Sequence, residues 1–166
     1  KSVKEKEQLE LHHNQLSSEN APNYWEHKKY GTVGAVALDK NGNIAAGTST
    51  GGLTNKKYGR IGDSPIIGAG TYANNKTCGV SSTGTGEFFI RTNAAFHVSS
   101  LVDYKGISIQ QASDDVIHNH IGKLGGDGGM IVLDTLGHVA YSFNTSGMFR
   151  GYKNSDGEEK IEAFKN

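Results

Sequence analysis

Thr32 follows Gly31 where a polar stretch gives way to a run of small and apolar residues. Its hydroxyl can attack the unhindered Gly31 carbonyl and turn the peptide bond into an ester that water opens. Cleavage frees the Thr32 α-amine, whose ordinary pKa of about 8 lets it accept a proton at neutral pH. The dipeptide thus permits autocleavage and a combined nucleophile and base, although taken alone it favours an ordinary strand threonine.

Arg60 and Asp63 carry opposite charges three residues apart. A guanidinium fork suits a carboxylate, and a carboxylate suits an ammonium group, so the pair can select a free amino-acid head group. The alternative is a local salt bridge between the two side chains with no ligand.

Glycine is the outlier of the composition, at 23 of 166 residues, about twice the usual share. The glycines lie beside Thr, Ser and Asp in clusters at 47–52, 84–86 and 125–129. Such clusters occur where a backbone closely approaches another backbone or a ligand. The 84–86 cluster lacks the third glycine of a dinucleotide fingerprint and the lysine of a phosphate-binding loop, so we do not interpret it as a nucleotide site.

Strands and helices must hold these residues in place. Residues 32–38 and 44–49 are small and apolar and flank an Asn-Gly turn, which predicts a β-hairpin. Both strands are apolar on both faces, as in a strand covered by layers above and below. Residues 1–30 are polar and charged and are predicted to form an exposed connector.

Two helices and a closing hairpin follow in the pattern. Apolar residues at helical spacing predict one helix over 90–101 and a second that begins with a capping box of Ser108 and Gln111. Apolar runs at 130–133 and 139–143 predict the last hairpin. Two hairpins and two helices make only one side of a layered structure, so we infer a missing partner segment.

Composition excludes several partner classes. Lys plus Arg and Asp plus Glu both number 17, so no net field favours nucleic acid or an anionic membrane. The apolar runs are far shorter than the roughly 18 residues of a membrane span. One cysteine, Cys78, excludes an intrachain disulfide framework and leaves the compartment, cytoplasmic or periplasmic, open.

Taken together, the motifs resemble the β-subunit of plant-type asparaginases and isoaspartyl peptidases, which are N-terminal-nucleophile hydrolases with a catalytic threonine. The resemblance covers essentially residues 31–150, in order and at matching spacings. The segments that carry it are 31–39 (GTVGAVALD), 41–43, 48–52 (TSTGG), 59–65 (GRIGDSP), 68–73 (GAGTYA) and 82–87 (STGTGE).

The resemblance implies a role for each matching residue. Thr32 matches the nucleophile, freed by cleavage after Gly31, and Thr50 matches a second threonine that supports it. Thr83 and Gly84 match the donors that stabilise the oxyanion. Around them lies the implied substrate pocket, in which Arg60 binds the α-carboxylate and Asp63 the α-ammonium group, with further lining by Ile61, Gly62, Thr83, Gly84, Thr85 and Gly86. No metal ligand is implied in this chain.

The resemblance also implies an organisation. Residues 1–31 correspond to the end of an α-subunit and a linker removed on autocleavage, and 32–166 to the catalytic β-subunit. The expected fold is α+β, part of an αββα four-layer sandwich completed by an α-subunit from the same precursor. The heterodimer is expected to pair again. No cofactor is required, and the loop for a structural alkali cation would lie in the upstream α-subunit.

The implied reaction is hydrolysis of L-asparagine or of β-aspartyl dipeptides through a β-aspartyl ester on Thr32. Gly31, Gly51 and Asp63 favour this branch over the glycosylasparaginases and the threonine aspartases. Two alternatives stay open: a glycosylasparaginase-type hydrolase, and an unprocessed, non-catalytic homologue that binds aspartyl-like ligands, because an acylated Thr32 amine cannot act as a base.

Overall fold

A computed structural model describes residues 31–164. The predicted connector over 1–30, and with it nearly all of the predicted linker, lies outside the described residues. The chain order is β1 (Val33–Leu38), β2 (Ile44–Ser49), β3 (Thr71–Ala73), β4 (Cys78–Gly84), α2 (Gly86–Thr92), α3 (Ala94–Lys105), α4 (Ile109–Asp114), the π-helix η1 (Asp115–Ile121), the 3-10 helix η2 (Gly122–Leu124), β5 (Gly128–Asp134), β6 (Val139–Phe143), β7 (Gly147–Lys153) and β8 (Glu159–Phe164).

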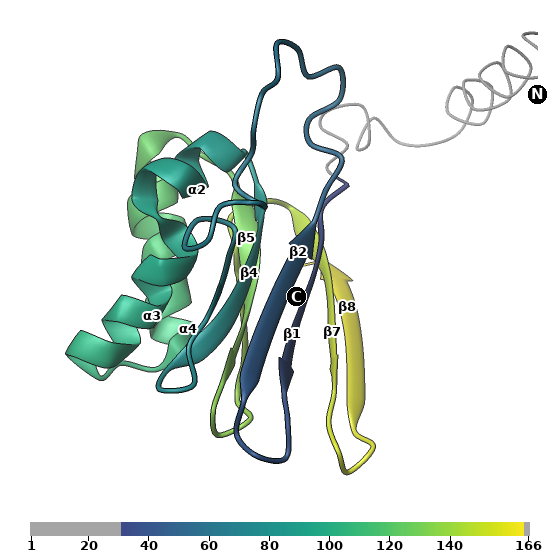
Figure 1. The fold of residues 1–166 in the computed structure, drawn as a ribbon, viewed down its shortest axis with the longest axis vertical. Helices are drawn as coiled ribbons and strands as arrows, with labels where there is room; N and C mark the ends of the chain where they lie inside the picture. The colour runs from purple at the N-terminus through teal and green to yellow at the C-terminus, as the bar shows by residue number, and fades with distance from the viewer. Residues whose placement is uncertain (1–30, 165–166) are drawn as a thin grey trace, which may run out of the picture.

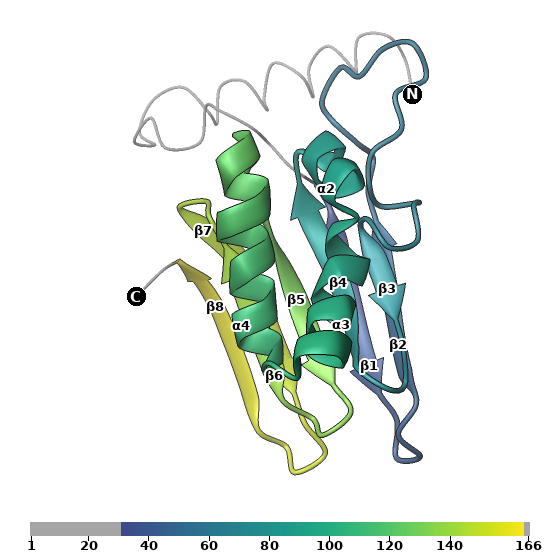
Figure 2. The same ribbon diagram turned by 90° about the vertical axis from the view of Figure 1, so that its left-hand side faces the viewer.

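The described part has three layers (Figures 1 and 2). Antiparallel strands in the order β3-β4-β5-β6 form the central sheet. The helices cover one face of this sheet, and the two-stranded ladders β1-β2 and β7-β8 cover the other (Figure 1). The apolar core lies between the helices and the central sheet and includes Phe89, Val98, Ile117, Met130 and Val132. The expected α+β class is confirmed, with one helical layer in the described residues.

The first predicted hairpin is confirmed. Strands β1 and β2 pair in antiparallel register from Val33↔Ser49 to Leu38↔Ile44. The turn between them is fixed by the Asp39 carboxylate, which accepts hydrogen bonds from the backbone N–H groups of Asn41 and Asn43 at 2.8 Å each. Local turn chemistry therefore sets this register.

Of the two covering layers predicted for this hairpin, the described residues supply one. Its inner face packs on the central sheet, where Ile44 is only 9% exposed, whereas Val33 on the outer face is 67% exposed. No second helical layer lies over the outer face within residues 31–164.

The first predicted helix is broken into α2 and α3. Asn93 between them adopts a left-handed backbone conformation, with φ of 48°. The break lets α3 begin against the loop before β3: the N–H groups of Ala95 and Phe96 donate to the carbonyls of Ala69 and Gly68, at 3.1 and 2.8 Å. Carbonyls from another segment thus satisfy the free N–H groups of the α3 N-terminus, which periodicity could not reveal.

The second helix begins as predicted. Ser108 caps α4, and both hydrogen bonds of its capping box with Gln111 are present. The helical path then continues through the π-helix η1. The hairpin β5-β6 is also confirmed, but the chain does not close with it, because a third hairpin, β7-β8, follows.

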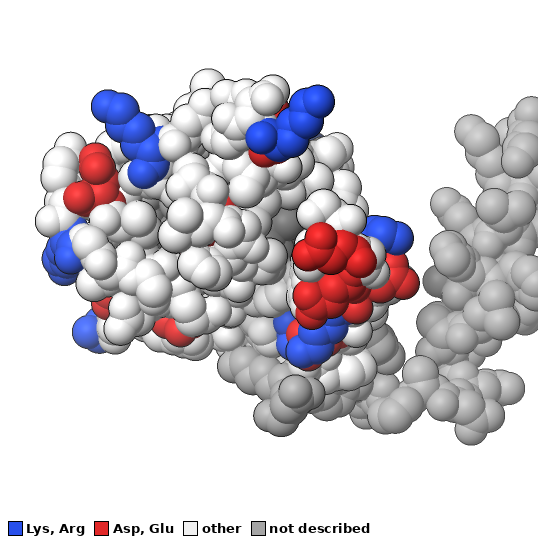
Figure 3. Space-filling view, turned by 90° about the horizontal axis from the view of Figure 1, so that it is seen from below, with Lys and Arg blue, Asp and Glu red and all other residues white. Residues whose placement is uncertain are grey.

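Charge is distributed without a basic patch on the end that carries the hairpin turns. Figure 3 shows single Lys and Arg side chains scattered over this face and acidic side chains gathered to one side. In residues 31–164, none of the helices has the length and apolar character needed to cross a bilayer.

Candidate active site

Glycines let strand β1 lie very close to strand β4. A β-carbon added to Gly34 would collide with the Ser81 side chain, and one added to Gly79 would lie 2.5 Å from side-chain atoms of Val36 and Ile44. Gly34 of β1 therefore lies against Ser81 of β4, and Val36 of β1 lies against Gly79 of β4, so the two strands run in opposite directions. Toward the start of β1 and the end of β4, Thr32 and Thr83 both line one cavity.

Thr32 and Thr50 face each other at the open end of the β1-β2 hairpin. The Thr32 hydroxyl donates to Thr50 Oγ1 at 3.0 Å, and the bond is partly buried. The backbone N–H of Gly52 also donates to Thr50 Oγ1, at 3.0 Å. The backbone therefore orients Thr50 as an acceptor for the predicted nucleophile.

Thr83 and Gly84 end strand β4 beside this pair. Gly84 has φ of 144°, and a β-carbon there would collide with the Asp127 carbonyl. Thr85 donates from its backbone N–H to the Asp127 carbonyl at 3.0 Å, and from its hydroxyl to the Asp127 carboxylate at 2.7 Å. Asp127, which the sequence reasoning missed, thus fixes the turn from β4 into α2.

Arg60 makes neither of the contacts weighed from the sequence. Its Nε and Nη2 donate to the two carboxylate oxygens of Glu87, at 2.8 Å each. This bidentate pair raises the pKa of Arg60 and lowers the pKa of Glu87. No Arg60–Asp63 salt bridge forms within the described residues.

The Asp63 side chain is buried and has one carboxylate oxygen that accepts no hydrogen bond within the described residues. It is 5% exposed, and its Oδ2 has no hydrogen-bond partner among residues 31–164. Burial, the largest cause, raises the pKa of this carboxyl, although Arg60 opposes the shift. A buried carboxylate oxygen without a partner is costly unless a ligand supplies a donor.

Two of the predicted pocket residues are glycines that make room for charged groups. A β-carbon at Gly62 would lie 2.9 Å from Arg60 Nη1, and one at Gly86 would lie 2.7 Å from the Asp63 backbone N and Oδ1. Ile61, by contrast, points outward and is 65% exposed. The sequence Thr83 to Gly86 therefore connects the threonine pair to the Arg60 and Asp63 cluster.

Comparison with known proteins shows the family of the chain. A family model described as asparaginase matches residues 1–162. The chain belongs to the asparaginase family. It is 56% identical over 127 residues to the isoaspartyl peptidase of Escherichia coli strain K12, covering 76% of this chain and 40% of the relative. It is 43% identical over 125 residues to the isoaspartyl peptidase/L-asparaginase of Mus musculus, covering 73% and 37%.

A third relative is similar over a slightly larger share of the chain. The plant-type L-asparaginase of Pyrobaculum calidifontis is 42% identical over 132 residues, covering 79% of this chain and 44% of the relative. The chain thus spans about two fifths of the length of the curated relatives it matches.

The cavity beside Thr32 runs away from the Arg60 and Asp63 cluster in this asparaginase-family chain. It has a volume of about 1110 Å³ and extends between β1 and β7, with Ser81 and Ile131 of the central sheet on its floor. Neither Arg60 nor Asp63 lines it. We therefore assign the cavity to the gap between the two outer ladders and locate the predicted head-group site on the other side of Thr83 and Gly84.

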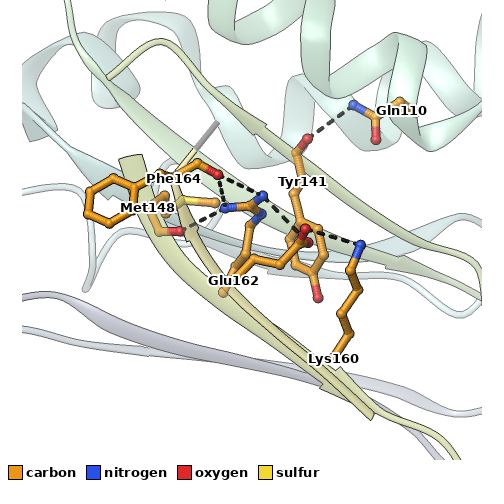
Figure 4. Close-up of polar contacts among 7 residues, drawn as sticks. Gln110, Tyr141, Met148, Lys160, Glu162 and Phe164 are labelled. Atoms are coloured by element: carbon orange, nitrogen blue, oxygen red, sulfur yellow. Dashed lines mark hydrogen bonds and ion pairs between the residues drawn. The ribbon is translucent and has the colours of Figure 1, made fainter. Parts of the chain in front are cut away.

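Arg150 stabilises the far wall of this cavity. Its Nη1 donates to the carbonyl of Met148 at 3.2 Å, and its Nη2 donates to that of Phe164 at 3.3 Å and lies 3.4 Å from a Glu162 oxygen (Figure 4). The guanidinium also lies 5.0 Å from the centre of the Phe143 ring. These contacts fasten the β7-β8 hairpin to β6, and we assign Arg150 a structural role.

The predicted site residues thus form two adjoining groups, and the described part offers no metal centre. Thr32, Thr50, Thr83 and Gly84 form one group, and Arg60, Gly62, Asp63 and Gly86 the other. No cluster of three His, Cys, Asp or Glu side chains within 31–164 is arranged to hold a metal ion.

Proposed function

We propose that the parent protein is an autoprocessing threonine amidohydrolase that cleaves the side-chain amide of L-asparagine or the isopeptide bond of β-aspartyl dipeptides. The observation that carries the proposal is the 3.0 Å hydrogen bond from the Thr32 hydroxyl to Thr50, next to the Gly31–Thr32 peptide bond. An ordinary strand threonine would not need an oriented hydroxyl acceptor and a neighbouring pair of oxyanion donors.

Maturation uses the same threonine. The Thr32 hydroxyl, polarised by Thr50, attacks the Gly31 carbonyl carbon; the carbon–nitrogen bond breaks, and the proton passes to the departing Thr32 nitrogen. Water then hydrolyses the ester and leaves a free Thr32 α-amine. Residue 31 and everything before it become a separate chain, and residue 32 becomes a new N-terminus.

Turnover then follows with Thr32 as nucleophile and base. The α-amine takes the hydroxyl proton as Oγ1 attacks the substrate amide carbon, and the Thr83 hydroxyl and the Gly84 N–H stabilise the oxyanion. The amine returns the proton to the leaving nitrogen, which departs as ammonia or as an amino acid. Water then hydrolyses the β-aspartyl ester and releases aspartate. The scheme uses no cofactor.

Substrate choice rests on the Arg60 and Asp63 group. The buried Asp63 oxygen without a partner supports a cationic ligand, and Arg60 carries N–H donors beyond those used on Glu87. A head group with an α-ammonium and an α-carboxylate satisfies both. The names of the relatives, isoaspartyl peptidase and L-asparaginase, are consistent with this class of substrate.

The upstream part of the parent would complete the fold as an α-subunit. The free edges of β1 and β7 face a cavity of about 1110 Å³, and exposed apolar side chains such as Val33 and Phe149 lie on the outer sheet. Strands in the gap and helices over the outer face would give the αββα sandwich. Pairing of two heterodimers, and an alkali cation in the upstream segment, stay predictions of the same scheme.

The proposal is tested by incubating the purified parent with L-asparagine and with a β-aspartyl dipeptide and measuring aspartate release. The Thr32→Ala variant is expected to release none. Thr135→Ala, which removes a threonine from the β5-β6 turn at the far end of the sheet, is the matched control and is expected to keep full activity. Equal rates in the parent and in Thr32→Ala would contradict the assignment of Thr32.

The alternatives make distinct predictions in the same assay. A parent that stays uncut and binds L-aspartate without turnover would be the non-catalytic homologue. A parent that hydrolyses N-glycosylated asparagine in preference to both substrates would be a glycosylasparaginase-type enzyme.

A further inference from the structure

We propose that Glu87 is a positioning residue for substrate recognition: it holds one edge of the Arg60 guanidinium so that the other edge faces the α-carboxylate of the substrate. This inference rests on the proposed function. It concerns a residue that touches Arg60 and not the reacting atoms.

The geometry of the pair divides the donors of Arg60 between two uses. A guanidinium has five N–H donors in a rigid plane. Glu87 takes two of them, from Nε and Nη2, at 2.8 Å each. The remaining three lie on Nη1 and on the outer side of Nη2, which together form the end-on edge. Within residues 31–164, Nη1 makes no hydrogen bond.

The surroundings keep the end-on edge accessible. Nη1 lies above Gly62, so close that a β-carbon there would be 2.9 Å away. A side chain at residue 62 would therefore occupy the space in front of this edge or displace the guanidinium. Glu87 fixes the guanidinium by two hydrogen bonds, and Gly62 leaves space in front of it. Together they leave three N–H donors of Arg60 directed to the Gly62 side.

Glu87 is placed for this role by the helix that follows the oxyanion donors. It is the second residue of α2, only three residues after Gly84. The same short segment therefore sets the oxyanion donors, the Gly86 contact with Asp63 and the Glu87 contact with Arg60. The Glu87 side chain is 49% exposed, so its ion pair is not needed to fill the core. A positioning role explains the bidentate geometry better than a contribution to stability does.

The test uses the full parent protein after maturation. Steady-state kinetics with L-asparagine and competitive inhibition by L-aspartate are measured for Glu87→Ala and Glu87→Gln. We expect Glu87→Ala to raise KM and the L-aspartate inhibition constant about tenfold and to change kcat by less than about twofold. Glu87→Gln keeps an acceptor oxygen at the same length and is expected to recover part of the loss. Glu159→Ala, which removes the exposed pair with Lys153 at 3.2 Å, is the control and should change nothing.

Four other outcomes would overturn the inference. A lower KM in Glu87→Ala would mean that Glu87 competes with the substrate for Arg60. An unchanged KM would mean that Arg60 needs no partner. A fall in kcat as large as the rise in KM would indicate a structural role. The same rise in KM in Glu87→Gln as in Glu87→Ala would indicate a structural role as well. In these cases a wild-type parent that cleaves itself and hydrolyses asparagine leaves the proposed function intact, whereas an inactive wild type overturns both.

Discussion

Gly34 of β1 lies directly against Ser81 of β4, with no room for a β-carbon between the two sheets. This contact sets the height of the β1-β2 hairpin above the central sheet. Thr32 is two residues before Gly34 and Thr83 is two residues after Ser81, and both line the cavity beside this contact. The position of Thr32 relative to the central sheet therefore depends on residue 34 being a glycine.

Gly34→Ala is expected to force the sheets apart. Inserting a methyl group into a close-packed contact typically costs about 1–3 kcal/mol. We expect the free energy of unfolding of the parent to fall by that amount, measured by chemical denaturation, and kcat to fall as Thr32 moves away from Thr83. Gly51→Ala is the matched control for the free energy of unfolding, because nothing lies within 4 Å of its β-carbon position. Equal effects of the two substitutions on the free energy of unfolding would contradict the contact.

Thr83→Ala removes a proposed oxyanion donor. Loss of one such donor usually lowers kcat by about a hundredfold to a thousandfold. We expect this loss with KM nearly unchanged, because the donor acts on the charge that develops during reaction. Thr83→Ser keeps the hydroxyl and is expected to retain most of the activity. If the alanine variant kept wild-type kcat, Thr83 would have no part in the chemistry.

Phe149→Ala distinguishes a covered outer sheet from a bare one. Phe149 is 78% exposed in the described part, so an isolated surface would predict almost no effect. If the upstream segment covers this face, truncation removes a buried ring and costs about 3–5 kcal/mol. We expect the larger loss in thermal unfolding of the parent. Leu136→Ala, in the β5-β6 turn and 79% exposed, is the control and should have little effect. A similar small change in both would contradict the fourth layer.

Asp63→Asn is expected to stabilise the parent while abolishing substrate binding. Burial raises the pKa of Asp63 above its ordinary value of 3.8. Because the folded state then binds the proton more tightly than the unfolded state, the contribution of Asp63 to stability is fully present below the ordinary pKa. This contribution is lost as the pH rises through the pKa of the folded state. Ionised Asp63 therefore destabilises the fold near neutrality. Without substrate, the asparagine variant should melt at a higher temperature at pH 7. The difference should shrink as the pH falls toward about 4. A variant that is less stable at pH 7 would contradict this reading of the burial.

Local patterns in the sequence predicted those elements whose signals are local. The turn after β1 was predictable because Asp39 and the Asn-Gly pair act within a few residues, and the start of α4 was predictable because its capping box spans only four residues. The threonine pair was found through family resemblance. Neither Thr32 nor Thr50 carries a distinguishing signal alone.

Elements determined by distant contacts could not be predicted in this way. Strand β4 reads CGVSSTG, and its small residues have weak strand propensity. They are small because helices and the outer hairpin both pack closely on it. The break at Asn93 depends on carbonyls of Gly68 and Ala69, which lie far away in sequence.

The role of Glu87 was hidden for a similar reason. An acidic residue in the first turn of a helix is an ordinary N-terminal signal, so its sequence position gives no hint of a partner. Arg60 lies 27 residues earlier, and only the fold brings the two together. Asp127, 42 residues after Thr85, was missed for the same reason.

The measurement that tests the central claim most directly is the intact mass of the parent protein, with N-terminal sequencing, after incubation at neutral pH beside its Thr32→Ala variant. The account predicts a new chain beginning at Thr32 in the parent and a single uncut chain in the variant. A folded parent that stays uncut, or a variant that is cut as readily, would contradict it.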